Sequence, residues 1–284
     1  MDVEVFFRLT RLEHAVMLSL AAIIGEIVAT GAFPPAGFLL LTAAAPFLIG
    51  MASFALNDLL DIETDRINKR TDRPLVSGEA SKGEAFDIIA FGFIAGNLVA
   101  LLASWTAFLI AVIFSTFAIL YSLKLKDLPL AGNVYIACTL AIPFIYGALV
   151  VSGTVSDDLA VISTMAFLVG LARELMKTAD DVEGDKAARK ARTLPMVIGP
   201  YNTILVASAL YVLAIVISYF PFLSGTTYRW SWPYFILITF ANSVFALVIY
   251  NSVLHGLKFL RRARNLSLLA LGAGLLGFLV GVLL

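Results

Sequence analysis

The sequence predicts an all-α integral membrane protein with nine transmembrane helices. Of its 284 residues, 60% are hydrophobic and only 14% are charged, whereas about a quarter of the residues in a soluble domain are charged. Apolar runs of about 18 residues or more recur along the chain, and each could cross the roughly 30 Å hydrocarbon core of a bilayer as a helix. Because lipid offers no partners to backbone polar groups, these runs should be helical.

Turn-forming residues separate most of the apolar runs. Pro34-Pro35, Gly153 and Pro233 mark three of the edges. The connection near Ser104 and Trp105 is very short, so the third and fourth spans should form a tight hairpin. Residues 1–284 are expected to form one polytopic domain, with spans at 14–31, 36–56, 85–103, 106–122, 132–151, 159–176, 202–219, 232–254 and 266–284.

The basic residues of the connecting loops predict the orientation. In the nine-span arrangement, 19 of the 20 Lys and Arg residues fall on one side, and only Arg229 falls on the other. Basic loops stay in the cytoplasm, so the amino terminus should be cytoplasmic and the carboxy terminus outside. The formal net charge is zero, so overall charge gives no case for nucleic-acid binding.

Three aspartates follow one another at the cytoplasmic end of the second span. Asp58, Asp61 and Asp65 are three and then four residues apart, which places them on one face of a helix. Asn57 adds an amide oxygen beside them. Three carboxylates so close together repel one another unless a cation neutralises them. Oxygen ligands suit a hard ion such as Mg²⁺.

A second acidic cluster follows the sixth span. Asp181 and Asp185 are four residues apart, so aligning them with Asp61 and Asp65 puts Thr178 opposite Asp58. We leave Thr178 out of the metal ligands because a hydroxyl is a poorer ligand for Mg²⁺ than a carboxylate. The two clusters lie four spans apart, which suggests two four-helix halves plus a final helix around a central cavity.

Two acidic clusters facing one cavity predict a site for metal ions and a diphosphate. The predicted metal ligands are Asn57, Asp58, Asp61, Asp65, Asp181 and Asp185. Basic residues nearby would contact phosphate oxygens. The predicted contacts to the diphosphate are Arg66, Lys124, Lys126 and Asn57.

Three segments of the chain resemble the motifs of the UbiA superfamily of intramembrane prenyltransferases. They are Asn57-Asp58-x-x-Asp61-x-x-x-Asp65 with its continuation Arg73-Pro74-Leu75, then Tyr121-Ser122-Leu123-Lys124-Leu125-Lys126, then Asp181-Val182-Glu183-Gly184-Asp185-Lys186 with its continuation Thr193-Leu194-Pro195. The resemblance covers essentially the whole chain, since the family also has nine spans.

The resemblance implies transfer of a prenyl group from its diphosphate to an acceptor in the membrane, with Mg²⁺ as cofactor. Asp61, Asp65 and Asp181 would be catalytic. An allylic carbocation would form when the C1–O bond breaks, and the aromatic faces of Tyr121 and Tyr146 would stabilise it. No obligate protein partner is implied.

The second acidic motif is most similar to the archaeal branch that joins geranylgeranyl diphosphate to geranylgeranylglyceryl phosphate in ether-lipid synthesis. Two other readings stay open on the sequence. One is an aromatic acceptor: the opening Arg11-Leu12-Glu13-His14 favours a quinone-type acceptor, and chlorophyll synthases have similar residues in the second acidic motif. The other is a membrane transporter, because acidic residues in membrane proteins are often ion sites. The transporter reading is the weaker, because the acids lie at span ends.

Overall fold

The computed structural model describes residues 1–67, 69–182, 192–224 and 227–284. Within these ranges, nine helices are long and apolar enough to cross a membrane, and they confirm the nine predicted spans. These long helices are α2 (Leu12–Thr30), α3 (Ala36–Leu60), α6 (Lys82–Ala103), α7 (Trp105–Leu123), α8 (Ala131–Val151), α9 (Asp157–Asp180), α12 (Pro200–Ile217), α14 (Trp232–His255) and α15 (Leu257–Leu283). The division into two four-helix halves stays a prediction.

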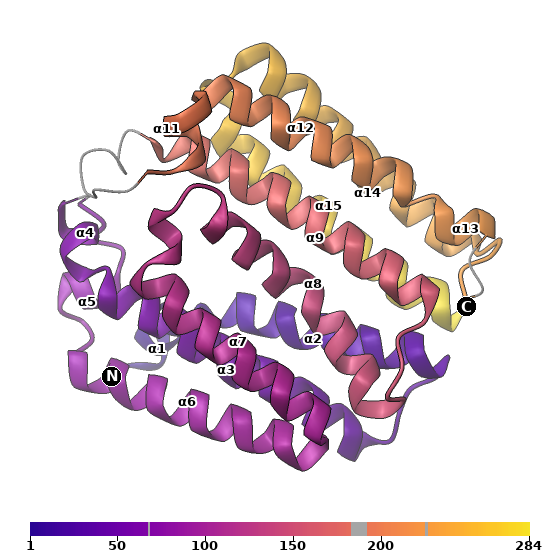
Figure 1. The fold of residues 1–284 in the computed structure, drawn as a ribbon, viewed down its shortest axis with the longest axis horizontal. Helices are drawn as coiled ribbons and strands as arrows, with labels where there is room; N and C mark the ends of the chain where they lie inside the picture. Colours follow the sequence, from indigo (N-terminus) through magenta and orange to yellow (C-terminus); the bar gives the residue numbers. More distant parts are fainter. Residues whose placement is uncertain (68, 183–191, 225–226) are drawn as a thin grey trace.

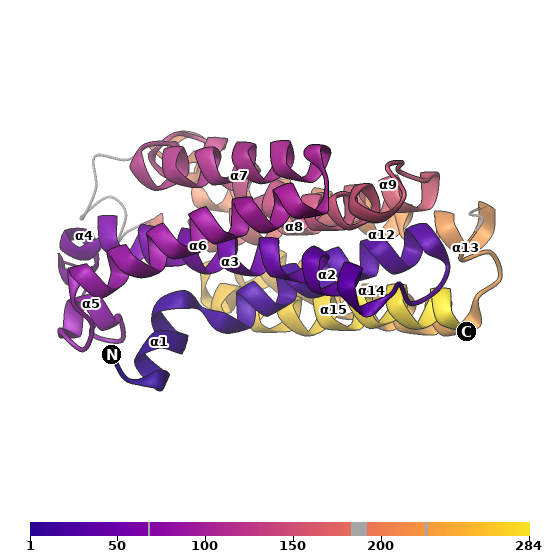
Figure 2. The ribbon, with the colours of Figure 1, turned by 90° about the horizontal axis from the view of Figure 1, so that it is seen from below.

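Short helices lie at the two ends of the bundle. The helices α4 and α5 lie at one end together with α11, on the side where the chain begins, whereas α13 lies at the other end near the carboxy terminus (Figure 1). The short elements are α1 (Val3–Thr10), α4 (Ile62–Ile67), α5 (Pro74–Ser77), η1 (Leu125–Asp127), α11 (Leu194–Ile198) and α13 (Phe220–Ser224). The long helices run side by side between these ends (Figure 2).

Each long helix packs on neighbours that are close in sequence and on a few that are distant. The helix α2 packs against both α3 and α8, α9 lies between α8 and α12, and α14 packs along α15. Contacts between α15 and both α2 and α9 bring the last helix back to the first. This ring of contacts encloses the space in which the candidate site lies.

The helices α2 and α8 approach closely because each of them has a glycine that faces the backbone of the other helix. A Cβ on Gly25 would stand 2.0 Å from the carbonyl oxygen of Phe144, and one on Gly147 would stand 1.8 Å from that of Ala22. No side chain fits at such distances. Small residues of this kind let helix backbones pack without a layer of side chains between them, which is how helices commonly associate in membranes.

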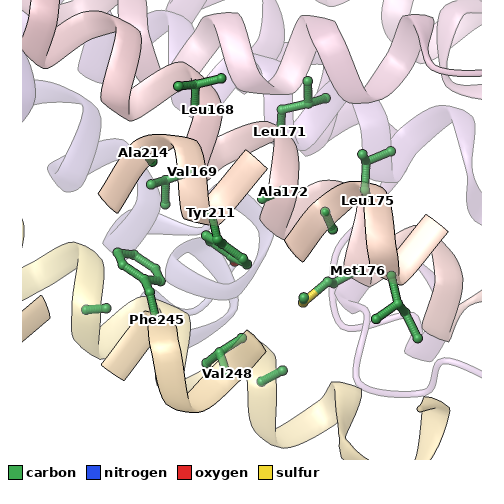
Figure 3. Packing of buried hydrophobic residues seen from close by; sticks show 14 of the residues in the cluster. Leu168, Val169, Leu171, Ala172, Leu175, Met176, Tyr211, Ala214, Phe245 and Val248 are labelled. Atoms are coloured by element: carbon green, nitrogen blue, oxygen red, sulfur yellow. The ribbon is translucent and has the colours of Figure 1, made fainter. Parts of the chain in front are cut away.

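The largest apolar cluster joins the last three long helices, α12, α14 and α15, to α9. Val169 and Ala172 of α9 lie beside Tyr211 of α12 and Phe245 of α14 (Figure 3), whose rings stack with centroids 4.9 Å apart. Tyr211 and Val248 are almost fully buried. This cluster supports α9 and thereby the second acidic motif at its end.

Two predicted connections can be compared with the structure. The tight hairpin is confirmed, because Ser104 alone separates α6 from α7 and its hydroxyl caps the second helix. The predicted basic loop after the eighth span was wrong. Only Gly256 separates α14 from α15, and Lys258 to Arg264 form the first turns of α15. Lys and Arg are good helix formers, and their long side chains can reach the headgroup region from a helix end.

Candidate active site

A cavity of about 1400 Å³ lies between the long helices. Pockets for small ligands usually measure about 300–1000 Å³, so this one can hold a long chain as well as a polar group. Its lining is charged at the end where α4 and η1 lie, and apolar further along, where Phe144, Met165 and Phe278 line it. The cavity therefore suits a molecule with a charged head and a long apolar tail.

Three residues of the first acidic motif line the charged end. The helix α3 ends at Leu60, and Asp61 occupies the C-cap position before α4 begins. Asn57, Asp61 and Asp65 all contribute to the cavity wall. The Asp61 carboxylate accepts a hydrogen bond of 2.6 Å from Lys126 Nζ. Burial raises the pKa of the Asp65 carboxyl, and Arg73, with Nε 4.0 Å from Asp65 Oδ2, only partly offsets this effect.

Asp58 does not share the position of its two neighbours. Its side chain is only 1% exposed and is absent from the cavity lining. Arg11 Nη2 donates to Oδ1 at 2.7 Å, and Arg73 Nη1 lies 3.0 Å from both carboxylate oxygens. The expected single helical face breaks at Asp61, so Asp58 binds two arginines and does not face the site. We therefore leave Asp58 out of the metal ligands proposed below.

The second acidic motif reaches the same end of the cavity. Asp181 is the C-cap residue of α9, is exposed and lines the cavity. Arg70 links the two motifs electrostatically. Its hydrogen bonds to Asp72 raise its pKa, and the negative charges of Asp65 and Asp181 add to this rise. The predicted ligand Asp185 lies outside the described residues.

The predicted phosphate contacts divide into two groups. Lys126 is 10% exposed and lines the cavity beside Asp61. Arg66 and Lys124 are exposed on the surface, and neither belongs to the cavity lining. Arg66 instead pairs with Glu63 one turn away on α4, with 2.9 Å between Nη1 and Oε1. The spacing in the sequence could not distinguish cations that face inward from those that face the solvent.

The two predicted tyrosines lie at different depths. Tyr121 lies in the last turn of α7 near the charged end and packs against Tyr135, with ring centroids 5.1 Å apart, and both line the cavity. Tyr146 also lines the cavity but is buried 15 residues after the start of α8. At 1.5 Å per residue, this places it about 22 Å along the helix, far from the acidic motifs.

Sequence reasoning missed several cations of the cavity wall. Arg11, Arg70, Arg73, Arg173 and Lys177 all line it. Arg73 belongs to the first motif, and Arg173 and Lys177 precede Asp181 by eight and four residues on α9. The helical spacing before Asp181 was the available signal for the last two, because such spacing puts them on the same face as that aspartate.

Comparisons with known proteins give the family and the fold to which the chain is similar. Residues 18–269 match the UbiA prenyltransferase family. The digeranylgeranylglyceryl phosphate synthase of Archaeoglobus fulgidus is 36% identical over 274 residues, which is 96% of this chain and 93% of the relative. Among solved structures, one concerning digeranylgeranylglyceryl phosphate synthase in membranes has a TM-score of 0.79 and 27% identity, covering 99% of this chain and 98% of the other.

A more distant structure is similar in fold. A UbiA homologue from Archaeoglobus fulgidus bound to GPP and Mg²⁺ has a TM-score of 0.68 and 18% identity, with coverage of 98% of this chain and 99% of that chain. The family match and the 36% identical relative confirm the resemblance seen in the sequence motifs at the level of the family.

Proposed function

Because the chain belongs to the UbiA prenyltransferase family, we propose that this membrane enzyme transfers a geranylgeranyl group from geranylgeranyl diphosphate to geranylgeranylglyceryl phosphate. The relatives named above as synthases of the digeranylgeranyl product support this choice of donor and acceptor. The difference between the charged end and the apolar end of the cavity is the observation that supports this proposal most strongly. A charged end suits the diphosphate, and the apolar continuation suits a chain of twenty carbons.

Mg²⁺ fits the donor atoms at the charged end. Asn57, Asp61 and Asp65 offer oxygens from one side, and Asp181 offers oxygens from the other. Within the described ranges, no three acidic, histidine or cysteine side chains already converge as a metal-binding group. Mg²⁺ usually binds through one or two carboxylates together with substrate phosphates, so the diphosphate would complete its ligands. When bound, Mg²⁺ would neutralise the charge that develops on the departing diphosphate.

Two cations of the wall, Lys126 and Arg70, would hold the diphosphate. Lys126 pairs with Asp61 in the structure and would exchange this partner for a phosphate oxygen. Arg70 donates two hydrogen bonds to Asp72, which fix its guanidinium close to both motifs. Asp58 keeps Arg11 and Arg73 in place. We propose that Asp58 positions Arg11 and Arg73, whereas Lys126 and Arg70 contact the diphosphate directly.

Once the C1–O bond breaks, the allylic cation would lie just below the diphosphate. The faces of Tyr121 and Tyr135 lie near this end and would stabilise the positive charge without reacting with it. Tyr146 lies too deep for this role and would instead contact the prenyl chain. The oxygen of the acceptor hydroxyl then forms the new C–O bond with C1, and its proton passes to the released diphosphate.

We propose that the charged end faces the cytoplasm. The basic residues gather on that side in the nine-span arrangement, as expected for cytoplasmic loops. Both substrates would then enter from the cytoplasmic half of the membrane, and the carboxy terminus would lie outside.

A single incubation tests the proposed function. Purified enzyme in lipid nanodiscs receives Mg²⁺, labelled geranylgeranyl diphosphate and either geranylgeranylglyceryl phosphate or 4-hydroxybenzoate. We expect labelled digeranylgeranylglyceryl phosphate and release of diphosphate. A product on 4-hydroxybenzoate alone would identify an aromatic acceptor. No product with any acceptor, together with transport of a solute in vesicles, would reject the transferase proposal.

A further inference from the structure

A partly buried arginine lies below the acidic motifs on α9. Arg173 precedes Asp181 by eight residues on the same helix, which is about 12 Å at 1.5 Å per residue. Its side chain is 15% exposed and lines the cavity. The cavity therefore carries a second basic position, deeper in the membrane than the site proposed for the diphosphate.

The negative charge near Arg173 does not match the positive charge. Glu174 is its ion-pair partner, with 3.6 Å between Arg173 Nη1 and Oε1. The same carboxylate also receives Lys177, whose Nζ lies 3.4 Å from Oε2. One carboxylate thus serves two cations. Arg173 Nε is buried and has no hydrogen-bond partner in the part of the chain that the structure describes.

Among the described residues, the side chains on other helices that interact with Arg173 do not supply the missing anion. His14 of α2 and Tyr211 of α12 are close enough to interact with it electrostatically. Neither carries a negative charge at neutral pH. Glu13, the acidic neighbour of His14, is 69% exposed and is engaged with the His14 ring at 3.1 Å. The next acid along α9, Asp180, lies 3.6 Å from Arg264.

Four other cations of the wall lie closer to their carboxylates than Arg173 does. Arg11 and Arg73 also share one carboxylate, and Arg73 Nε is also buried without a hydrogen-bond partner, but these two arginines donate to Asp58 at 2.7 and 3.0 Å. Lys126 donates to Asp61 at 2.6 Å and Arg70 to Asp72 at 3.0 Å, whereas Arg173 lies 3.6 Å from Glu174. A buried charge without a full partner is costly. Since Arg173 faces the cavity, the partner that compensates this cost can come from a bound molecule.

We propose that Arg173, assisted by Lys177, binds the phosphate of the lipid acceptor. This inference rests on the proposed function and assigns the acceptor phosphate a site separate from that of the diphosphate. A guanidinium offers two parallel N–H donors that match two phosphate oxygens. Lys177 adds a point charge one turn nearer to Asp181.

The geometry of the reaction agrees with this position. The acceptor hydroxyl has to come within about 3–3.5 Å of the prenyl C1 atom. Its phosphate is attached to the neighbouring carbon of the glycerol, only a few bonds away. C1 lies just below the diphosphate, so the acceptor phosphate falls further along α9, toward Arg173. The separation also keeps the two anionic groups apart while both are bound.

The test compares two acceptors that differ only in the phosphate. Full-length enzyme in nanodiscs is assayed with geranylgeranylglyceryl phosphate and with geranylgeranylglycerol. For Arg173→Gln we expect kcat/KM with the phosphorylated acceptor to fall about 10- to 100-fold, the range for losing hydrogen bonds to a charged group. Turnover of the alcohol and the KM for geranylgeranyl diphosphate should change by less than about two-fold, so the preference for the phosphorylated acceptor disappears.

Two further variants control for folding and for general charge effects. Arg173→Lys keeps the charge but loses the fork, and it should retain part of the preference. Arg262→Gln removes a cation that is exposed on α15 and outside the cavity lining, and it should behave as wild type. Equal losses with both acceptors in Arg173→Gln, or a matching rise of the KM for the diphosphate, would overturn the inference.

A binding measurement separates this inference from the proposed function. If the wild-type enzyme makes no product from the phosphorylated acceptor, the proposed function fails. The thermal unfolding midpoint with added geranylgeranylglyceryl phosphate still tests the site. A rise in the midpoint that is present in wild type and absent in Arg173→Gln supports a phosphate site, whereas equal rises in both reject it.

Discussion

Replacing Asp58 by Asn should lower stability strongly while leaving the response to Mg²⁺ intact. The Asp58 carboxylate is 1% exposed and holds two guanidiniums, at 2.7 Å from Arg11 and 3.0 Å from Arg73. Removing one partner of a buried ion pair costs about 3–5 kcal/mol. Arg11 and Arg73 keep 24% and 18% exposure, so water can partly compensate them, and we expect the lower end, about 3 kcal/mol.

The assay is equilibrium unfolding in mixed micelles, with and without Mg²⁺ and a prenyl diphosphate. Asp65→Asn is the matched control. Burial raises the pKa of Asp65, so the folded state disfavours its charged form, and an uncharged amide should leave stability equal or slightly higher. The same variant should lose the stabilisation by Mg²⁺. If Asp58→Asn is as stable as wild type and has lost the Mg²⁺ response, Asp58 is a metal ligand and our placement of its role is wrong.

Three other predictions concern the charged end of the cavity. Asp61→Ala and Asp181→Ala should lower transfer by at least about 100-fold in a protein that is still inserted in the membrane; near-normal turnover in either would reject the proposed metal site. Lys126→Gln should raise the KM for geranylgeranyl diphosphate about 10-fold or more, as expected for a lost charged hydrogen bond. In Lys124→Gln this KM should stay within about two-fold of wild type, because Lys124 lies outside the cavity lining. Equal effects of the two substitutions in steady-state kinetics with varied diphosphate would show that this distinction is wrong. The apparent affinity for Mg²⁺ should fall as the pH drops through the raised pKa of Asp65, because protons compete with the metal for that carboxylate. The fall should begin at a higher pH than an ordinary aspartate would give. A calorimetric titration of Mg²⁺ binding with no such pH dependence would contradict this prediction.

The spans could be predicted from the sequence because the membrane constrains them so strongly. Backbone groups in lipid have to pair within their own helix, so an apolar run of sufficient length has one structural solution. The boundary of the last span was misplaced by the basic residues before it. Because of these charged residues the apolar run begins only near residue 266, whereas the helix already begins at Leu257.

The candidate site could be predicted in part. Spacing identified Asp61, Asp65 and Asp181, and the structure brings all three to one cavity. The same spacing also included Asp58, because it assumed a helix that continues past Leu60. The helix ends there, and its last turn directs Asp58 toward Arg11, 47 residues earlier in the chain. No local pattern contains such a pairing.

The sequence by itself determined that this chain spans the membrane nine times and carries two acidic motifs on one side, since hydropathy and helical periodicity are local properties. Only the tertiary structure decided which charged groups face the cavity and which face each other. Arg66 and Lys124 lie on the surface, and Asp58 pairs with Arg11 and Arg73. Arg173 shares the carboxylate of Glu174 with Lys177. The physical reason is that a buried charge is stabilised by whatever group packing brings within hydrogen-bond distance, and packing depends on contacts between residues far apart in the chain.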